Sequence, residues 1–258
     1  MEIIGLLIIV GGILFFVFRN HRQSSSQKDI RDLQISRELQ NRELSSRYDT
    51  SQPRGYVQNA QCFDPVTRKF FDGRDTANII VLDIETNGLS SRFSVLSCSA
   101  IKLNVSLLNC TFNELDRFDR YYYPIEPFEA KAIAINGLTK EEISRRRGGA
   151  TYPMHFTHDK DFDRFCGDVH GFVCHNTDFE SRFVAQMGQC RKFCTMKTNT
   201  GVVKTRYLSW KEDYKWPTLE ETAQHYEIHV DRDRLHNSMV DVEITASIFH
   251  KMLKNGTP

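Results

Sequence analysis

The segment from Asn78 to Ser90, NIIVLDIETNGLS, limits the possible folds of this chain more than any other segment. It begins with β-branched and aliphatic residues, which is typical of a buried strand. Asp83 and Glu85 end this run, and side chains two positions apart on a strand point to the same side of the sheet. Two adjacent carboxylates repel each other unless a cation binds between them, and Mg²⁺ and Mn²⁺ prefer oxygen ligands. The segment therefore predicts either a divalent-metal site at a strand terminus or an ordinary strand that ends in solvated charges.

A second segment, residues 3–18, has no charged residue and is apolar apart from its glycines. As a helix it would span about 24 Å, and the following Arg19 can extend toward the membrane surface to complete a short crossing. A cleavable signal peptide is the alternative, but the basic start and the small-residue cleavage site are missing. We expect a transmembrane anchor over residues 1–18. Basic residues follow it and none precedes it, which predicts a single-pass protein of a bacterial-type inner membrane with the remainder in the cytoplasm.

The rest of the chain divides into a polar region and a globular domain. Residues 19–76 are expected to form a tether rich in Ser, Gln, Arg and Glu, followed by an extension whose Phe63, Phe70 and Phe71 pack onto the domain. The 258 residues, 40% hydrophobic and 26% charged, suffice for one sizeable domain, expected over residues 77–256. A net charge of +1 neither requires nor excludes nucleic acid. The seven cysteines form no C-x-x-C pair, which favours reduced thiols.

Alternating strand and helix signals predict an α/β domain. After the opening strand, four more strands are expected over residues 93–103, 118–123, 171–174 and 191–196. The first connections are short enough for antiparallel neighbours, whereas helical segments separate the later strands.

Helix signals come from capping patterns and from apolar spacing. Thr139 with Glu142 and Thr218 with Glu221 each match a capping box. A short helix is expected over residues 160–165, and an amphipathic helix after the fourth strand should turn Phe179, Phe183 and Val184 toward the core. A final helix over residues 238–252 has an apolar residue at every fourth position: Val240, Ile244, Ile248 and Met252.

Further acidic and histidine residues fall at the expected ends of these elements. His236 precedes the final helix, Asp241 lies in its first turn, and Glu180 begins the helix after the fourth strand. Each has an ordinary reading, because a carboxylate at a helix start often complements the helix dipole and a single histidine is usually structural. Together they are candidates to meet Asp83 and Glu85 at one site.

Three motifs in this order carry a family resemblance: DIETNG at residues 83–88, HNTDFE at 175–180 and HNSMVD at 236–241. The set resembles the DEDDh 3′–5′ exonucleases, which include the proofreading subunit of bacterial DNA polymerase III and ribonuclease T. Two smaller segments, INGLT and WPTLEETAQHY, agree with this. The resemblance covers about residues 77–254 and implies an RNase H-like fold, a mixed five-stranded sheet flanked by helices, here preceded by one N-terminal transmembrane helix.

The resemblance also implies the chemistry of the site. Asp83, Glu85 and Asp241 would hold two Mg²⁺ or Mn²⁺ ions with Glu180, and His236 would be the general base. Phosphodiester hydrolysis would then release nucleoside 5′-monophosphates from 3′ ends of DNA or RNA. One position departs from the family, because its middle motif ends in Asp where this chain has Glu180. Asp178, two residues earlier, is the competing ligand, and a helix would turn the two about 200° apart.

Substrate contacts are expected from the turn after the first strand and from the middle motif: Thr86, Asn87, Leu89, His175 and Asn176. Residues 197–216 mix basic and aromatic side chains, which suits a nucleic-acid strand or a solvated loop packed on the domain. The run Arg145–Arg146–Arg147 is open to the same two readings. The function expected is a membrane-anchored 3′–5′ exonuclease acting on single-stranded ends. A non-catalytic nucleic-acid-binding module and a nucleotide phosphohydrolase on the same metal site are the alternatives.

Overall fold

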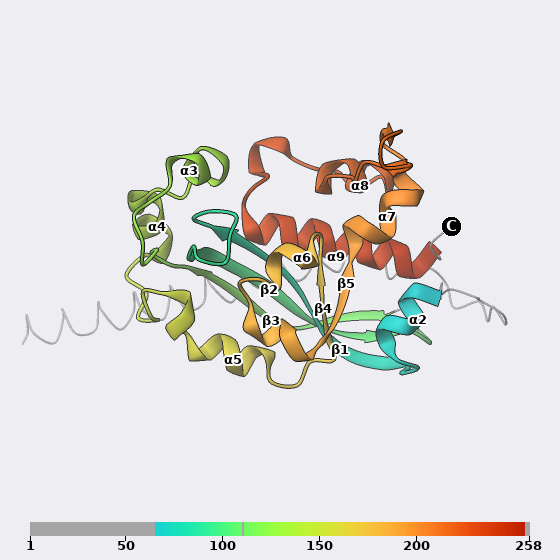
Figure 1. Cartoon of the computed structure of the whole chain (residues 1–258). Coiled ribbons are helices and arrows are strands. Elements are labelled where there is room, and N and C mark those ends of the chain that lie inside the picture. The colour runs from blue at the N-terminus through green and yellow to red at the C-terminus, as the bar shows by residue number, and fades with distance from the viewer. Residues whose placement is uncertain (1–64, 110, 256–258) are drawn as a thin grey trace, which may run out of the picture. The chain divides into compact units, whose positions relative to one another are not determined.

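A mixed five-stranded sheet lies at the centre of the computed structural model, which describes residues 65–109 and 111–255 (Figure 1). The strands are β1 (Thr76–Thr86), β2 (Val95–Ser106), β3 (Thr111–Tyr121), β4 (Gly171–Cys174) and β5 (Arg191–Cys194). Their order in the sheet is β3-β2-β1-β4-β5. β1 pairs antiparallel with β2 and parallel with β4, so the predicted mixed sheet is confirmed.

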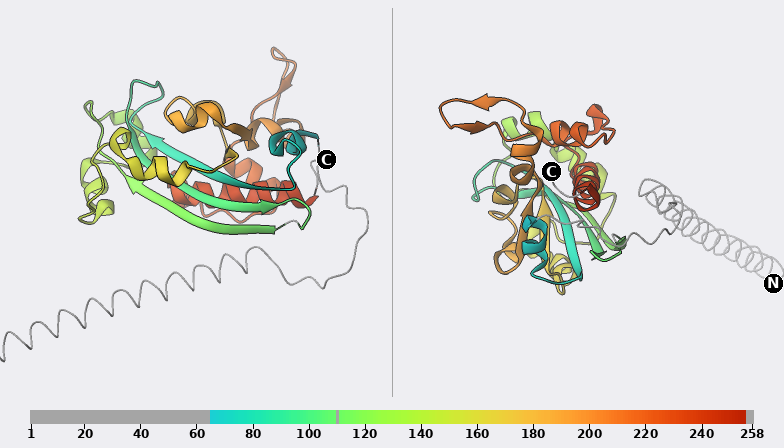
Figure 2. Two further views of the ribbon diagram at one scale, coloured as in Figure 1. Left: turned by 90° about the horizontal axis from the view of Figure 1, so that it is seen from below. Right: turned by 90° about the vertical axis from the view of Figure 1, so that its right-hand side faces the viewer.

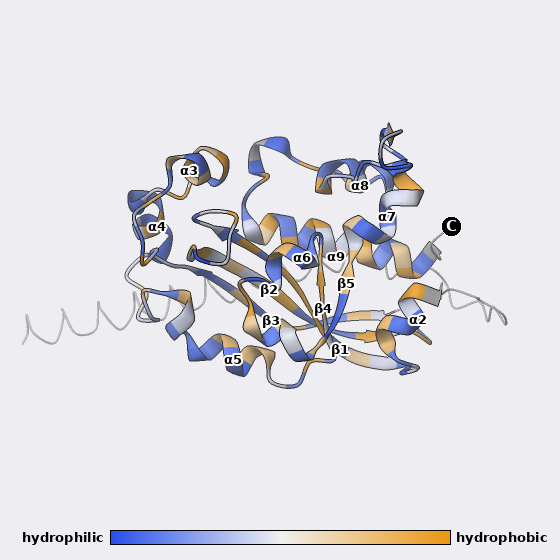
Figure 3. Cartoon of the chain, viewed as in Figure 1, coloured by the Kyte–Doolittle hydropathy of each residue, from blue (hydrophilic) through white to orange (hydrophobic). Residues whose placement is uncertain are grey.

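Both faces of β1 are buried, which explains its nearly continuous apolar run. Ile79 and Val81 point to one face, where they pack with the last helix, α9 (Ser238–Asn255). Ile80 and Leu82 point to the other face, where they share a core with α5 (Lys160–Cys166). In the hydropathy colouring β1 and β4 are largely orange, whereas α5 and α9 show both orange and blue segments (Figure 3). The central strand is therefore fixed from two sides, and so is the position of any residue at its end.

The helix α2 (Pro65–Phe71) adds two aromatic side chains to the α9 side of the core. Phe70 and Phe71 are buried, as the sequence suggested, whereas Phe63 lies outside the described residues. The Phe70 ring packs edge-on against Phe193 of β5, with 5.5 Å between ring centroids. It lies so close to β4 that a Cβ on Gly171 would come within 2.7 Å of it. A larger residue at Gly171 would therefore displace α2 from the sheet.

Smaller helices and a hairpin connect the strands. The remaining helices are α3 (Ala130–Asn136), α4 (Lys140–Arg147), α6 (Thr177–Glu180), α7 (Thr195–Val203) and α8 (Leu219–His225). Single 3₁₀ turns cover Phe156–His158, Ala185–Gln189 and Arg232–Arg234. A separate two-stranded hairpin is formed by β6 (Tyr207–Leu208) and β7 (Asp213–Tyr214).

Several expected elements need correction. The amphipathic helix after β4 is a single turn, α6, although Val184 is buried and Phe179 and Phe183 pack against the core as expected. The fifth strand ends at Cys194, whose sulfur accepts a hydrogen bond from the Lys197 backbone amide and starts α7, which the sequence pattern did not reveal. α3 was also not predicted, because AKAIAIN has no capping signal and its residues are not buried.

The two predicted capping boxes differ. Thr218 and Glu221 form the reciprocal pair of hydrogen bonds, so this prediction is confirmed. Thr139 caps α4 through the Glu142 amide, but the Glu142 carboxylate binds Arg145 and Arg146 instead of turning back. Opposite charges one turn along the helix thus outcompete the second half of the box.

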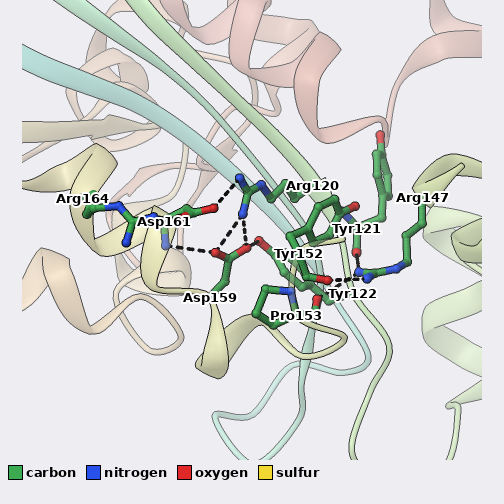
Figure 4. Close-up of polar contacts among 9 residues, drawn as sticks. All are labelled: Arg120, Tyr121, Tyr122, Arg147, Tyr152, Pro153, Asp159, Asp161 and Arg164. Carbon is green, nitrogen blue, oxygen red and sulfur yellow. Dashed lines mark hydrogen bonds and ion pairs between the residues drawn. The ribbon is translucent and has the colours of Figure 1, made fainter. Parts of the chain in front are cut away.

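A polar cluster joins β3 to the segment that follows α4 (Figure 4). Arg147 donates to the backbone carbonyls of Tyr121, Tyr152 and Pro153 at 2.7–3.1 Å. Arg120 donates from one nitrogen, Nη1, to both oxygens of the buried Asp159 carboxylate, at 2.7 and 2.8 Å. All three residues of the arginine run have partners, because Arg145 and Arg146 pair with Glu142 and Arg147 binds these backbone carbonyls, which favours the structural reading of the run.

The predicted membrane anchor, residues 1–18, lies outside the described residues. Within residues 65–109 and 111–255, no helix is both long and apolar enough to cross a membrane.

Candidate active site

Asp83 and Glu85 lie near the carboxyl end of β1, half-buried, on the face of the sheet that α9 covers. Their partners across the antiparallel ladder are Ser99 and Ser97 of β2. The ladder shifts register directly after Glu85, and such an irregularity often marks the place where a strand redirects its side chains. Because the two acids are two positions apart on the strand, both carboxylates face the start of α9.

Three serines hold the start of α9 on the sheet. The fully buried Ser238 hydroxyl lies 2.9 Å from Ser97 Oγ and 2.7 Å from Ser99 Oγ. Ser99 in turn donates to Asp119 Oδ1 at 2.8 Å. Because Ser238 is the first residue of α9, these bonds fix where Asp241, in its first turn, projects. Serine residues give no catalytic signal in the sequence, and this anchoring role was not predicted.

His236 has a left-handed backbone conformation, with φ of 64°. This conformation is uncommon outside glycine and costs on the order of 1 kcal/mol or more, so it persists only where neighbouring groups fix it. Here the His236 amide donates to Asp241 Oδ2 at 3.2 Å. Glu85, His236 and Asp241 each offer a ligand atom within 4.8 Å of the others. The structure thus brings three of the predicted site residues together.

Glu180 joins them from the other side, whereas Asp178 does not. Glu180 is 3% exposed on α6, and Asp178 is exposed and ion-paired with Lys197 of α7. Two buried oxygens at the site, Glu180 Oε2 and Asp241 Oδ1, have no hydrogen-bond partner among the described residues. Unpaired buried carboxylate oxygens are costly, so these two atoms are acceptors that a bound cation would satisfy.

Burial raises the pKa of all four carboxylates, and repulsion from a neighbouring carboxylate adds to this at Asp83, Glu85 and Glu180. Burial, followed by the charges of Glu85, Asp241 and Glu180, raises the pKa of Asp83 well above its usual value. Burial and the Asp241 charge raise the pKa of Glu85 to about 8, although a hydrogen bond from Asn136 opposes this. Burial also raises the pKa of Glu180 to about 8, and it raises that of Asp241 to about 6 although His236 opposes this. Four acids from three separate elements therefore share one weakly hydrated site.

Comparison with known proteins assigns this arrangement to a family. The family model described as Exonuclease (RNase_T) matches residues 80–249, about two thirds of the chain. This chain belongs to the exonuclease family. Its sheet and helices are accordingly an RNase H-like exonuclease fold.

Individual relatives are more distant. The exonuclease is 26% identical over 180 residues to DNA polymerase III PolC-type of Bacillus cereus, covering 68% of this chain and 11% of that protein. It is 27% identical over 195 residues to the PolC-type polymerase of Staphylococcus epidermidis, covering 74% of this chain and 12% of that one. The chain thus spans about a tenth of the length of these curated relatives.

Solved structures to which the chain is similar include three exonucleases. Exonuclease X, in complex with 5′ overhanging duplex DNA, has a TM-score of 0.46 at 17% identity, covering 69% of this chain and 93% of that one. A 3′-exonuclease that recognises the histone mRNA stem-loop has a TM-score of 0.48 at 13% identity, and the match covers 71% of this chain and 83% of that one. Escherichia coli Exonuclease I with a dA16 oligonucleotide has a TM-score of 0.48 at 14% identity, and the match covers 70% of this chain and 41% of that one.

The side chains of the exonuclease fit a divalent cation. Its donor set consists of carboxylate oxygens and one imidazole, which suits Mg²⁺ or Mn²⁺, and the two unpaired buried oxygens supply acceptors with no internal donor. A bound cation would also reverse the raised pKa values, since ionised ligands are the ones that bind metal.

The predicted substrate residues of the β1–β2 turn differ in exposure. Leu89 is 76% exposed, whereas Thr86 is buried and donates to the Gly88 carbonyl. Asn87 is fully buried, and its side chain makes three hydrogen bonds of 2.8–2.9 Å to the segment 126–129. Leu89 is thus free to meet a ligand, while Asn87 could contact substrate only by breaking internal bonds.

The two middle-motif candidates also differ. His175 is held on both ring nitrogens, by Thr195 Oγ1 at 3.0 Å and by the Pro217 carbonyl at 3.1 Å. Its burial lowers its pKa to about 4, so this imidazole is neutral and links β4 to the segment before α8. Asn176 is half-buried at the start of α6, and its side chain forms no cap there. Asn136, which the sequence did not single out by itself, donates to the Thr86 carbonyl and contacts Glu85.

Proposed function

We propose that this chain is a metal-dependent 3′–5′ exonuclease that removes nucleoside 5′-monophosphates from single-stranded ends of DNA or RNA. The observation that carries the proposal is the convergence of two half-buried carboxylates, two buried ones and His236, with two carboxylate oxygens left unpaired within the described residues. A structural cluster of acids would be paired with Arg or Lys, and no such partner reaches these four acids within the described residues.

Each residue has a separate task in this proposal. Asp83, Glu85, Glu180 and Asp241 hold the divalent ions. When bound, the ions neutralise the phosphodiester, acidify a water and stabilise the leaving 3′ oxygen. His236 accepts the proton of the attacking water as general base. Its side chain is exposed, so the proton can pass on to solvent.

Leu89 orients the substrate. Its exposed side chain, on a turn that Asn87 anchors, can wedge against the terminal base. The turn itself requires glycine, because a Cβ on Gly88 would lie 2.4 Å from the Phe93 ring. A rigid turn with an apolar tip beside the acids fits a mononucleotide end better than a continuous duplex.

We also propose that residues 3–18 anchor the enzyme in the membrane, on the basis of their uncharged apolar composition. Deleting residues 1–22 should move the protein from the detergent-extracted to the soluble fraction while cleavage is retained. Recovery of the full-length chain in the soluble fraction without detergent would contradict the anchor.

The activity is tested by product analysis with single-stranded oligonucleotides labelled at the 5′ or the 3′ end, in Mn²⁺ and in Mg²⁺. The proposal predicts a 5′-labelled ladder that shortens by one nucleotide at a time and immediate release of the 3′ label as a mononucleotide. Binding without cleavage in either metal would support the non-catalytic alternative. Hydrolysis of free nucleotides but not of oligonucleotides would support a phosphohydrolase.

A further inference from the structure

The hairpin β6–β7, with its flanking residues 204–216, stands out from the exonuclease domain and carries no role in the site described above. In both views of Figure 2 it projects from the same side of the domain as the β1–β2 turn that bears Leu89. Its strands are two residues long, and a hairpin this short gains little stability by itself. A protruding element with so little internal stabilisation is more readily explained by a ligand than by folding.

The aromatic residues of this hairpin are only partly used for packing. Tyr207 and Tyr214 pack edge to face across the hairpin, with 5.5 Å between ring centroids. Trp210, at the tip, is 80% exposed, and Trp216, at the base, is 47% exposed. Exposing a Trp to this extent forfeits the burial of a large apolar surface. The alternative reading of this segment, aromatic residues packed on the domain, therefore fails for Trp210.

Basic side chains alternate with these rings. Four basic residues stand against two acidic ones between residues 204 and 216: Lys204, Arg206, Lys211 and Lys215, against Glu212 and Asp213. Lys211 lies over the Trp216 ring, with Nζ 4.6 Å from the centroid, and Lys197 lies 5.8 Å from the same ring. The Arg206 guanidinium is exposed and has no acidic partner within the described residues. Cations beside aromatic faces are the combination that binds phosphates and bases of a single strand.

The base of the hairpin is connected to the active site. The Pro217 carbonyl, next to Trp216, accepts a hydrogen bond from His175 at the start of the middle motif. Lys197, which also lies near the Trp216 ring, is ion-paired with Asp178, two residues before Glu180. These contacts place the basic and aromatic residues beside the α6 side of the carboxylate site.

We propose that the hairpin is a second binding surface for the same strand, which it holds upstream of the terminal nucleotide by stacking on Trp210 and by phosphate contacts from Arg206 and Lys211. This inference rests on the proposed exonuclease function and deepens it. A ligand that has to reach both the carboxylate site and the hairpin is longer than a mononucleotide, so the enzyme gains affinity for long single strands.

Binding is measured with the full-length chain by fluorescence anisotropy of a single-stranded oligonucleotide of about 20 nucleotides, in EDTA, so that cleavage does not interfere. Trp210→Ala should weaken binding by about 5- to 100-fold, the usual effect of one stacked base, and Trp210→Phe should restore most of it. Arg206→Ala combined with Lys211→Ala should reduce the slope of log affinity against log salt by about 1.4, or 0.7 for each phosphate contact. The same measurement with DNA and RNA oligonucleotides of matched sequence shows which of the two nucleic acids the hairpin binds.

Two control variants are provided by the chain. Lys160→Ala removes an exposed lysine of α5 that, like Lys211, has one weak ion pair with a nearby Asp. Leu108→Ala removes a 75% exposed apolar side chain from the β2–β3 turn. Both should bind the oligonucleotide like the wild type.

Cleavage supplies the second readout. The ratio of kcat/KM for the long oligonucleotide to that for a dinucleotide should fall about tenfold in Trp210→Ala. Equal losses on both substrates, or hairpin variants that bind and cut the long strand like the wild type, would overturn the inference while leaving the exonuclease intact. A wild-type chain that binds through the hairpin but never cleaves would instead overturn the proposed function alone.

Discussion

Glu180 and Asp178 are two residues apart, yet only Glu180 faces the other acids. α6 is a single helical turn, so it separates the two side chains by about 200°. Glu180 enters the site with its Oε2 unpaired, while Asp178 turns to solvent and Lys197. The longer Glu side chain therefore reaches the site without any shift of the motif, which favours it as the middle-motif ligand.

This contrast predicts opposite outcomes for two isosteric changes. Glu180→Gln should abolish most cleavage and weaken Mn²⁺ binding, whereas it should stabilise the metal-free fold, since the cost of burying an ionisable carboxyl group is removed. Asp178→Asn loses only an exposed ion pair, so its effect on stability should be at most about 1 kcal/mol. Cleavage rates measure the effect of each change on activity, and urea unfolding in EDTA measures its effect on stability. If Asp178→Asn is inactive and Glu180→Gln is active, the ligand assignment is reversed.

The left-handed backbone conformation of His236 determines which substitution is suitable at this position. His236→Asn is preferable to His236→Ala, because Asn tolerates positive φ better and the fold is then unchanged. We expect kcat to fall by roughly 10² to 10⁴, the usual contribution of a general base, with little change in oligonucleotide affinity. Turnover is measured across pH 5–9. A variant with the wild-type pH profile would remove His236 from this role.

The raised pKa values make the metal-free fold sensitive to pH. Between the ordinary carboxyl pKa near 4 and the raised values of about 8 for Glu85 and Glu180, the folded state binds more protons than the unfolded state. The free energy of unfolding in EDTA should therefore fall, by roughly 2–5 kcal/mol, as pH rises from 5 to 8. The Glu85→Gln and Glu180→Gln double variant should show a shallower decline. Stability that rises over this interval would contradict the raised values.

At the scale of elements, α9 carries the third motif and serines fix its start. Ser238, Ser97 and Ser99 form a buried hydroxyl cluster between the helix and β2, directly beside the ladder positions of Asp83 and Glu85. The precision of the site therefore depends on groups that do no chemistry.

Ser238→Ala tests this arrangement. It leaves the hydroxyls of Ser97 and Ser99 without their shared partner, so we expect a loss of about 1–3 kcal/mol in the free energy of unfolding and a drop in kcat. Ser247→Ala is the matched control, because its hydroxyl binds only the Glu243 carbonyl within the same helix. If the two variants show the same activity, the cluster does not position Asp241.

The sequence predicted elements with regular patterns and missed those that depend on distant contacts. The nearly continuous apolar run of β1 and the four-residue spacing of Ile244, Ile248 and Met252 both correspond to buried residues. α7 was missed because its N-terminal cap is the sulfur of Cys194, and cysteine is not among the residue types that usually cap helices. The hairpin β6–β7 was missed because its paired residues are too few for a strand pattern.

At the scale of the whole molecule, the site is made by the topology of the sheet. β1 is central, α9 covers one face and α6 follows the neighbouring parallel strand, so residues separated by more than 150 positions meet at one point. The motifs could indicate which residues take part, because each lies at the end of an element. They could not indicate that Asn87 and His175 are held by internal hydrogen bonds, since those partners lie elsewhere in the sequence.

The central claim is that these acids bind catalytic metal ions, and a Mn²⁺ titration of the chain followed by electron paramagnetic resonance tests it most directly. We predict two bound Mn²⁺ per chain at pH 8, reduced in Glu85→Gln and in Asp241→Asn, and weaker binding at pH 6, where more of the acids are protonated. A chain that binds no Mn²⁺ at millimolar concentration, or binds it equally well in both variants, would contradict the account.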